Sequence, residues 1–205
     1  MKPENLSENN INEYSDITPR SLSFISFASG LIWIIVGLIV ITLFHDQSIT
    51  DIIFSSKLLL SQVLTGTVFG LLFGWIGVLM LNHDALRKTL NDYTIIQILK
   101  NTPLSKPLII QISLIAGITE EFLFRAAIQP LLGIWLTSLI FIALHGYIRF
   151  KTVYHLLFTI FSFALSMMLG YLFIFFGLIS AIIAHAVYDY VLLSRIADQN
   201  KSGKK

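Results

Sequence analysis

The sequence contains no cysteine among its 205 residues, which excludes disulfide-stapled folds, thiolate zinc sites and cysteine nucleophiles. Charge is also scarce, because 13% of the residues are charged, against about 25% in typical soluble domains. Apolar residues make up 55% of the chain, and the mean hydropathy is +0.77. This composition argues against both a water-soluble enzyme and a disordered chain. A net charge of +2 is too small to indicate a nucleic-acid partner. We therefore expect an integral membrane protein.

Long apolar runs predict the architecture, because about 20 apolar residues in a helix cross the hydrocarbon core of a bilayer. Six such runs are residues 22–44, 58–81, 108–132, 134–148, 152–175 and 177–193. The last four runs are separated only by very short turns, the first of them at Gly133, so we expect antiparallel neighbouring helices. The predicted fold is all-α and polytopic, with about six transmembrane helices and a C-terminal four-helix bundle.

The polar segments complete the expected organisation. Residues 1–21 and 195–205 are predicted to be polar and basic cytoplasmic tails, respectively. Residues 82–107 are predicted to be a cytoplasmic interfacial segment between the two N-terminal spans (22–81) and the four-helix core (108–194). Apolar and basic residues alternate in this segment, which is typical of an amphipathic helix in the membrane interface. An ordinary solvated helix explains the same pattern equally well.

The basic residues predict the topology and the localisation. With the N-terminus inside, twelve of the 14 Lys and Arg residues lie in inside segments and one, Lys57, lies outside. Basic residues concentrate on the cytoplasmic side of membrane proteins. We therefore expect a multi-pass protein of the cell membrane with both termini in the cytoplasm. Its expected partners include membrane lipids.

Few ionisable side chains lie within the predicted spans. Each costs at least ~2.5–3.5 kcal/mol at the bilayer centre, so such residues usually mark a site or a pathway. They are Glu120, Glu121, Arg125, His145, His155, His185 and Asp189. We interpret His155, at the inner start of the fifth span, as interfacial.

Helical geometry gives the two adjacent glutamates different expected roles. Glu121 and Arg125 are four residues apart, in the order that favours an ion pair. Glu120 points about 140° away from Arg125 on an α-helix. We expect Arg125 to neutralise Glu121 and to leave Glu120 facing a cavity, where it could act as a general base. A clamp that only fixes helix packing explains the Glu121–Arg125 pair equally well, but it does not account for Glu120.

Two histidines extend the candidate site. His185 and Asp189 are four residues apart and share a face of the last span. Asp189 could orient the imidazole, or both residues could bind one ligand or metal. His145 follows Phe141 by four residues on the fourth span. A histidine in an apolar helix is often only structural, but two of them with these carboxylates in one bundle favour a site.

Three motifs built from these residues resemble those of a known family. Glu120-Glu121-Phe-Leu-Phe-Arg125 resembles the E-E-x-x-x-R motif of the CAAX prenyl protease and bacteriocin-processing (CPBP or Abi) family. Phe141 to His145 resembles its F-x-x-x-H motif, and His185 to Asp189 its H-x-x-x-N/D motif. The order, the spacing and the placement on successive spans agree with that family. The resemblance implies an intramembrane endopeptidase whose catalytic core is the four-helix bundle and whose substrate is a peptide or a prenylated peptide.

The resemblance also implies a role for each motif residue. Glu120 with His145 would activate the attacking water. His185 with Asp189 would polarise the scissile carbonyl or hold its oxyanion. The residues that would give structural support are Glu121, Arg125 and Phe141.

Asp189 departs from the commonest form of the motif, because many family members have Asn at this position. An ionised carboxylate cannot donate a hydrogen bond to an oxyanion. Asp189 must therefore be protonated, orient His185 or bind a metal. The four implied catalytic residues could be ligands of a divalent metal such as zinc, but the sequence lacks His-Glu-x-x-His. We favour a site without a tightly held metal.

Two alternatives come from other functional classes. A proton- or cation-coupled transporter could use Glu120, His145 and His185 as a relay. The chain shows neither the inverted repeat nor the broken helices that mark many transporters. A non-catalytic Abi-like membrane scaffold is the other alternative, and the intact motifs argue against it.

The predicted spans place two site residues at different depths. Glu120 lies about 18 Å from the inner end of its span, and His145 lies about 5 Å from its own. A shared site needs both at one level. Either the third helix begins near Lys106 outside the hydrocarbon, or the fourth continues past Arg149.

Overall fold

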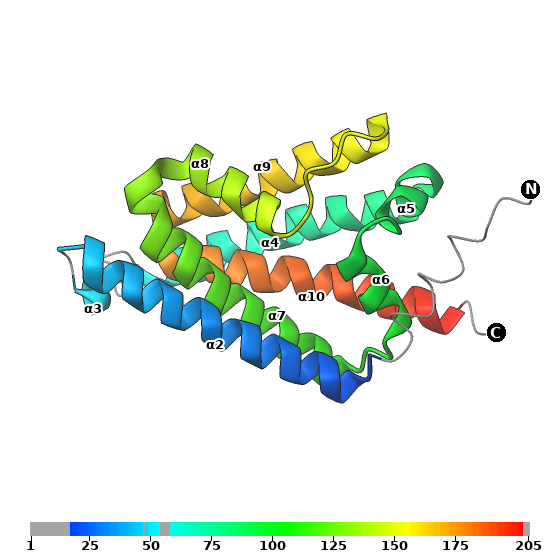
Figure 1. Ribbon diagram of the computed structural model, residues 1–205, viewed down its shortest axis with the longest axis horizontal. Helices are drawn as coiled ribbons and strands as arrows, with labels where there is room; N and C mark the ends of the chain where they lie inside the picture. Colours follow the sequence, from blue (N-terminus) through cyan, green and yellow to red (C-terminus); the bar gives the residue numbers. More distant parts are fainter. Residues whose placement is uncertain (1–16, 47, 54–57, 203–205) are drawn as a thin grey trace, which may run out of the picture.

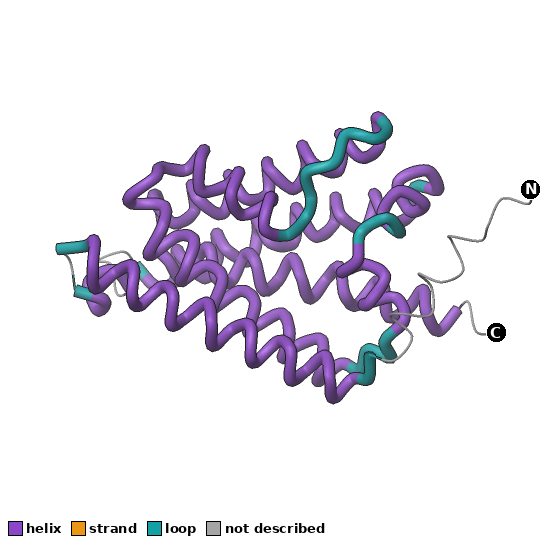
Figure 2. The backbone as a smooth tube through the Cα atoms, viewed as in Figure 1, coloured by secondary structure: helices purple, strands orange, loops and turns teal. Residues whose placement is uncertain are grey.

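The computed structural model describes residues 17–46, 48–53 and 58–202. These residues form helices joined by short loops, and no strand occurs in them (Figure 2). The helices are α2 (Pro19–Phe44), α3 (Ile49–Ile53), α4 (Leu59–Asn82), α5 (Asp84–Leu90), α6 (Thr94–Asn101), α7 (Lys106–Glu121), the π-helix η1 (Phe122–Ile128), α8 (Gln129–Leu144), α9 (Val153–Phe176) and α10 (Leu178–Ser202). The expected all-α fold is confirmed. Nearly all of the expected N-terminal tail lies outside the described residues.

Five helical stretches of the described chain are long and apolar enough to cross a bilayer, which confirms a polytopic membrane protein. They are fewer than the six expected spans because α7, η1 and α8 follow one another without interruption from Lys106 to Leu144. Inside α8, Gly133 has a non-helical backbone (φ 75°, ψ 168°), and the chain folds back there (Figure 1). The turn expected at Gly133 is therefore present.

The part of α8 after this turn is too short to be a span of its own. Only eleven helical residues separate Gly133 from the end of α8 at Leu144. They cover about 16 Å, roughly half the thickness of a bilayer core. The fourth span predicted at 134–148 is thus wrong in its length, and a loop of residues 145–152 leads on to α9. The difference in depth between Glu120 and His145 had two possible explanations. The structure agrees with the first, because α7 begins at Lys106, and not with the second, because α8 ends at Leu144, before Arg149.

Helix α10 packs against α4, α7 and α9 and runs through the middle of the bundle (Figure 1). The contact with α4 is close because glycines line the facing side of α4. A Cβ atom on Gly66 would lie 2.6 Å from the Ser180 carbonyl oxygen, and one on Gly70 would lie 2.7 Å from that of Ala184. Small residues allow such backbone approach between membrane helices. These glycines thus fix α10, and with it the site residues on α10, against α4.

The segment 82–107 does not lie apart as one interfacial helix. It forms the two short helices α5 and α6, and α6 packs against α10. Leu90, Tyr93 and Leu99 are buried in a cluster that includes residues of α7, α9 and α10. The apolar face expected to meet lipid is therefore turned in part toward protein. At the other end of the chain, α10 continues as a helix to Ser202, so the described part of the expected C-terminal tail is helical.

Candidate active site

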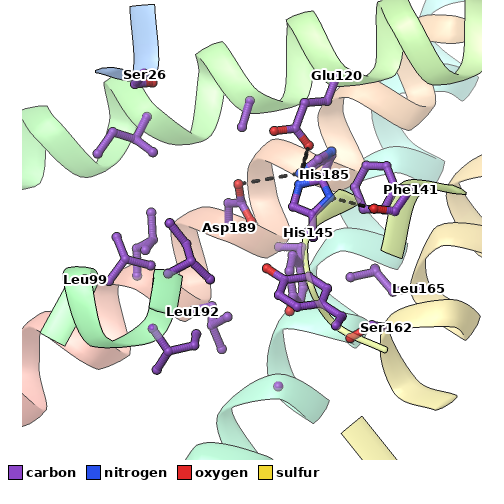
Figure 3. Close-up of a pocket in the computed structure, with 18 of the residues that line it drawn as sticks. Ser26, Leu99, Glu120, Phe141, His145, Ser162, Leu165, His185, Asp189 and Leu192 are labelled. Carbon is purple, nitrogen blue, oxygen red and sulfur yellow. Dashed lines mark hydrogen bonds and ion pairs between the residues drawn. The ribbon is translucent and has the colours of Figure 1, made fainter. Parts of the chain in front are cut away.

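Helices α7, α8 and α10 bring the four implied catalytic residues together at one cavity (Figure 3). Glu120 lies near the end of α7, His145 directly follows α8, and His185 and Asp189 lie one turn apart on α10. The Oε2 atom of Glu120 is 3.3 Å from Nε2 of His145 and 3.9 Å from Nε2 of His185. The Oδ2 atom of Asp189 is 3.6 Å from the same His185 nitrogen. Two carboxylates and two imidazoles therefore face one point.

Arg125 and Glu121 form the buried ion pair expected from their spacing. Both side chains are 0% exposed, and Nε of Arg125 donates to Oε2 of Glu121 at 2.9 Å. The same guanidinium also donates to Oε1 of Gln129 at 3.3 Å and to Oγ of Ser166 at 2.8 Å. Gln129 in turn donates to the carbonyl oxygen of Gly170 at 3.0 Å. The network ties α7 and η1 to α9 and leaves Glu120 outside it.

Glu121 does more than pair with Arg125, because its second oxygen orients His185. The Oε1 atom of Glu121 lies 2.8 Å from Nδ1 of His185. A carboxylate that pairs with Arg125 is ionised and accepts only, so the His185 Nδ1 carries the proton of this bond. The other ring nitrogen is left to face Glu120 and Asp189. The interpretation that Asp189 orients this ring is therefore replaced: Glu121 orients it, and Asp189 lies on the cavity side.

His145 is fixed by its own backbone and by two aromatic rings. Its Nδ1 donates to the Phe141 carbonyl oxygen at 2.8 Å, so Nε2 is the nitrogen that faces Glu120. The imidazole stacks on Phe141 at a centroid distance of 4.4 Å and an interplanar angle of 26°. Tyr147 lies 5.3 Å away at 33°. Phe141 also directs its ring toward His185 at 6.1 Å, so this residue positions both imidazoles.

The cavity has a volume of about 260 Å³ and is largely apolar. Its walls come from α2, α4, α5, α6, α7, α8, α9, α10 and the loop after α8. The polar site residues come from α7, from the end of α8 and from α10 (Figure 3). Two tyrosines that the sequence reasoning missed, Tyr147 and Tyr188, also line it. Tyr188 directly precedes Asp189 within the third motif, and that position was its only signal. Within the described ranges, no group of three or more histidine, aspartate and glutamate side chains has the arrangement of a metal site.

The other histidines lie away from this cavity. His155, expected to be interfacial, lies near the start of α9, where it is buried and bonded on both ring nitrogens. Its Nδ1 lies 2.8 Å from Oγ1 of Thr152, and its Nε2 lies 3.0 Å from Oδ2 of Asp92. It thereby ties the turn between α5 and α6 to the start of α9. His45, at the end of α2, bonds through Nε2 to the Ala127 carbonyl oxygen at 2.8 Å.

Comparison with known proteins agrees with this geometry. Residues 102–191 match the family model described as type II CAAX prenyl endopeptidase Rce1-like. These residues are an Rce1-like segment. The family resemblance drawn from the three motifs is thereby confirmed, and the Rce1-like segment contains all of the site residues named above. The matched family is one of CAAX prenyl endopeptidase-type proteases, and the chain is an integral membrane protein.

One curated relative is similar to part of the same region. The uncharacterized protein YpbD of Bacillus subtilis (strain 168) is 37% identical over 95 residues, which cover 45% of this chain and 47% of the relative. The matched region is thus about half the length of that relative. No solved structure matches the chain significantly.

Proposed function

We propose that this protein is an intramembrane endopeptidase of the CAAX-protease and bacteriocin-processing type, with Glu120 as the base that activates water. The observation that carries the proposal is the position of the Glu120 carboxylate between the Nε2 atoms of two imidazoles at the cavity wall. The neighbouring Glu121 is committed to Arg125 and His185. Glu120 is therefore the glutamate whose oxygen can accept a proton from water.

The proposed reaction needs one proton acceptor and one stabilised oxyanion. Water between Glu120 and His145 transfers a proton to the Glu120 carboxylate, and its oxygen forms a bond to the scissile carbonyl carbon. The π electrons of the carbonyl move to its oxygen. His185 with protons on both ring nitrogens donates from Nδ1 to Glu121 and from Nε2 to this oxyanion. When the oxyanion collapses, the C–N bond breaks, and the leaving nitrogen takes the proton back from Glu120.

The cavity is the basis for the proposed substrate class. Its walls outside the catalytic groups are mostly aliphatic and aromatic, as in sites that hold apolar ligands. A prenyl group or an apolar peptide segment would therefore be bound there, beside the scissile bond. We further propose that both termini and the substrate lie on the cytoplasmic side, in agreement with the distribution of basic residues.

Zinc is not assigned a step in this mechanism. The four catalytic side chains include nitrogen and oxygen donors that zinc accepts. Their arrangement, however, is not that of a metal site among the described residues. We assign the reaction to glutamate and histidine side chains, and addition of zinc or a chelator to the wild-type reaction tests this point.

The experiment uses the purified full chain in liposomes with internally quenched peptides, each in a prenylated and an unprenylated form. We expect Glu120→Gln to reduce cleavage by at least ~10²-fold, the lower range for loss of a general base. Asp84→Asn is the matched control, since that carboxylate is 81% exposed on α5 and pairs only with Arg87. Cleavage by Glu120→Gln at the wild-type rate would refute the proposed role.

The same liposomes distinguish the transporter alternative when they contain a pH-sensitive dye. Proton flux in the wild-type protein, with no cleavage of any peptide in a broad panel, would replace the peptidase proposal. Cleavage without flux, lost in Glu120→Gln, is the expected result.

A further inference from the structure

The site has more hydrogen-bond acceptors than donors. His145 already donates its Nδ1 proton to the Phe141 carbonyl, and His185 donates its Nδ1 proton to Glu121. The remaining groups that face the reacting point are the carboxylates of Glu120 and Asp189. A doubly protonated His185 supplies one donor to an oxyanion. Oxyanion sites commonly combine several preorganised donors, so a second donor is needed from elsewhere on the cavity wall.

Tyr147 is held rigidly beside this point. It follows Gly146, whose positive φ of 69° turns the chain sharply after α8. Its carbonyl oxygen accepts from Oγ1 of Thr159 at 2.6 Å, and its amide donates to the Ile142 carbonyl at 2.9 Å. The ring lies against Phe158 at a centroid distance of 5.2 Å, in addition to its contact with His145. Both the backbone and the ring of Tyr147 are therefore fixed by neighbouring elements.

The hydroxyl of Tyr147 is available for a substrate. The residue lines the cavity, and its hydroxyl makes no hydrogen bond with any residue in 17–46, 48–53 or 58–202. Its ring lies 5.3 Å from that of His145, so the phenol stands beside a catalytic group. A phenol keeps its proton at neutral pH and can donate it in a hydrogen bond. Tyr147 can thus supply the hydrogen-bond donor that the carboxylates of the site do not supply.

We propose that Tyr147 donates a hydrogen bond to the oxygen of the scissile carbonyl and acts with His185 as the oxyanion site. This inference rests on the peptidase function proposed above. As the carbonyl π electrons move to oxygen, the O–H bond of Tyr147 stays intact and stabilises the negative charge. Tyr147 thereby supplies the kind of donor that many relatives have as an Asn amide at the position of Asp189.

Tyr190 provides a matched control for this residue. It lies on α10, immediately after Asp189, and it is 41% exposed. Unlike Tyr147, it is not among the residues that line the cavity. Removal of its hydroxyl therefore makes the same chemical change outside the proposed site.

The first experiment compares Tyr147→Phe with Tyr190→Phe in the liposome cleavage assay. Loss of one oxyanion donor costs about 10²–10³-fold in kcat, so kcat of Tyr147→Phe should fall by this factor with little change in KM. Tyr190→Phe should stay within about threefold of wild type. Phe keeps the ring that packs on His145 and Phe158, so the melting temperature should not change. A raised KM with a lowered melting temperature would assign Tyr147 a packing role and overturn the proposal.

A second measurement tests the atom to which Tyr147 donates. The scissile amide is replaced by a thioamide, whose sulfur accepts hydrogen bonds poorly. If Tyr147 donates to this atom, the two changes should be strongly non-additive, since the second removes a bond that the first has already lost. Independent, additive effects would overturn the proposal. Wild-type activity in Tyr147→Phe would refute this inference alone, whereas a wild-type protein that cleaves no peptide would refute the peptidase function together with it.

Discussion

The substitution Glu121→Gln tests whether the two adjacent glutamates have the separate roles that their contacts indicate. Glu121 is fully buried and accepts hydrogen bonds from Arg125 and His185 through different oxygens. Glutamine has one acceptor oxygen, and its amide group would face one of these two donors. Arg125 would then retain only the neutral partners Gln129 and Ser166. The substitution therefore leaves a buried guanidinium without a counter-charge.

The burial and the partners of the two glutamates determine the expected loss of stability for each substitution. Removal of one partner from a buried ion pair costs about 3–5 kcal/mol in the free energy of unfolding. The Glu120 side chain is 15% exposed at the cavity and forms no ion pair with an arginine or lysine of the described ranges, so we expect Glu120→Gln to cost less than about 1 kcal/mol. Glu121→Gln should also reduce cleavage, because His185 loses the acceptor that orients it.

Equilibrium unfolding in mixed micelles, followed by circular dichroism, measures this difference between Glu121→Gln and Glu120→Gln. The double variant Glu121→Gln, Arg125→Met is the control, since it removes both charges and should recover part of the lost stability. Equal stability losses for the two glutamine variants would refute the reasoning. So would a double variant less stable than Glu121→Gln alone.

Two further predictions concern the α4–α10 contact and Asp189. Gly70→Ala should destabilise the protein by about 1–3 kcal/mol in the same unfolding assay, because its Cβ would meet the Ala184 carbonyl at 2.7 Å. Gly77→Ala should cost less, since its nearest contact is the end of the Leu192 side chain at 3.1 Å, and an equal cost would contradict the packing argument. Asp189→Asn should keep substantial cleavage activity, because the amide can donate to the oxyanion. A loss of activity that added zinc relieves would instead indicate a metal site.

Contacts within one helix were predictable from the sequence. The Glu121–Arg125 pair and the shared face of His185 and Asp189 follow from a spacing of four residues. The glycines of α4 likewise recur at spacings of three and four residues, which places them on one face of that helix. Such features depend on local geometry alone. They do not require knowledge of which helices are neighbours.

Contacts between helices were not predictable in the same way. The bond from Glu121 to His185 joins residues 64 positions apart and depends on how α7 packs against α10. The spacing of four residues predicts one partner for Glu121, which is Arg125. In the structure each of its two carboxylate oxygens accepts a hydrogen bond from a different residue, Arg125 or His185. Tyr147 was missed because it lies in a loop, where no periodicity exists. Its position is set by the turn at Gly146 and by the bond to Thr159.

Hydropathy also predicted too long a fourth span. The apolar run continues to Ile148, but the helix ends at Leu144. The residues that follow pack on protein: Tyr147 lies against Phe158 on α9. Hydropathy does not distinguish a side chain that faces lipid from one that faces another helix. The end of α8 therefore depends on a turn and on tertiary contacts.

The reversal of the chain at Gly133 explains how Glu120 and His145 reach the same depth. Glu120 lies fourteen residues from the start of α7, which is about 21 Å along the helix. The chain continues to Gly133, about 40 Å from that start, and then returns for about 16–18 Å to reach His145. This leaves His145 about 23 Å from the level of Lys106, close to the level of Glu120. On α10, His185 is seven residues from Leu178, or about 10 Å from the opposite side. The site thus lies well inside the bundle, where ionisable groups are costly unless a cavity admits water and partners.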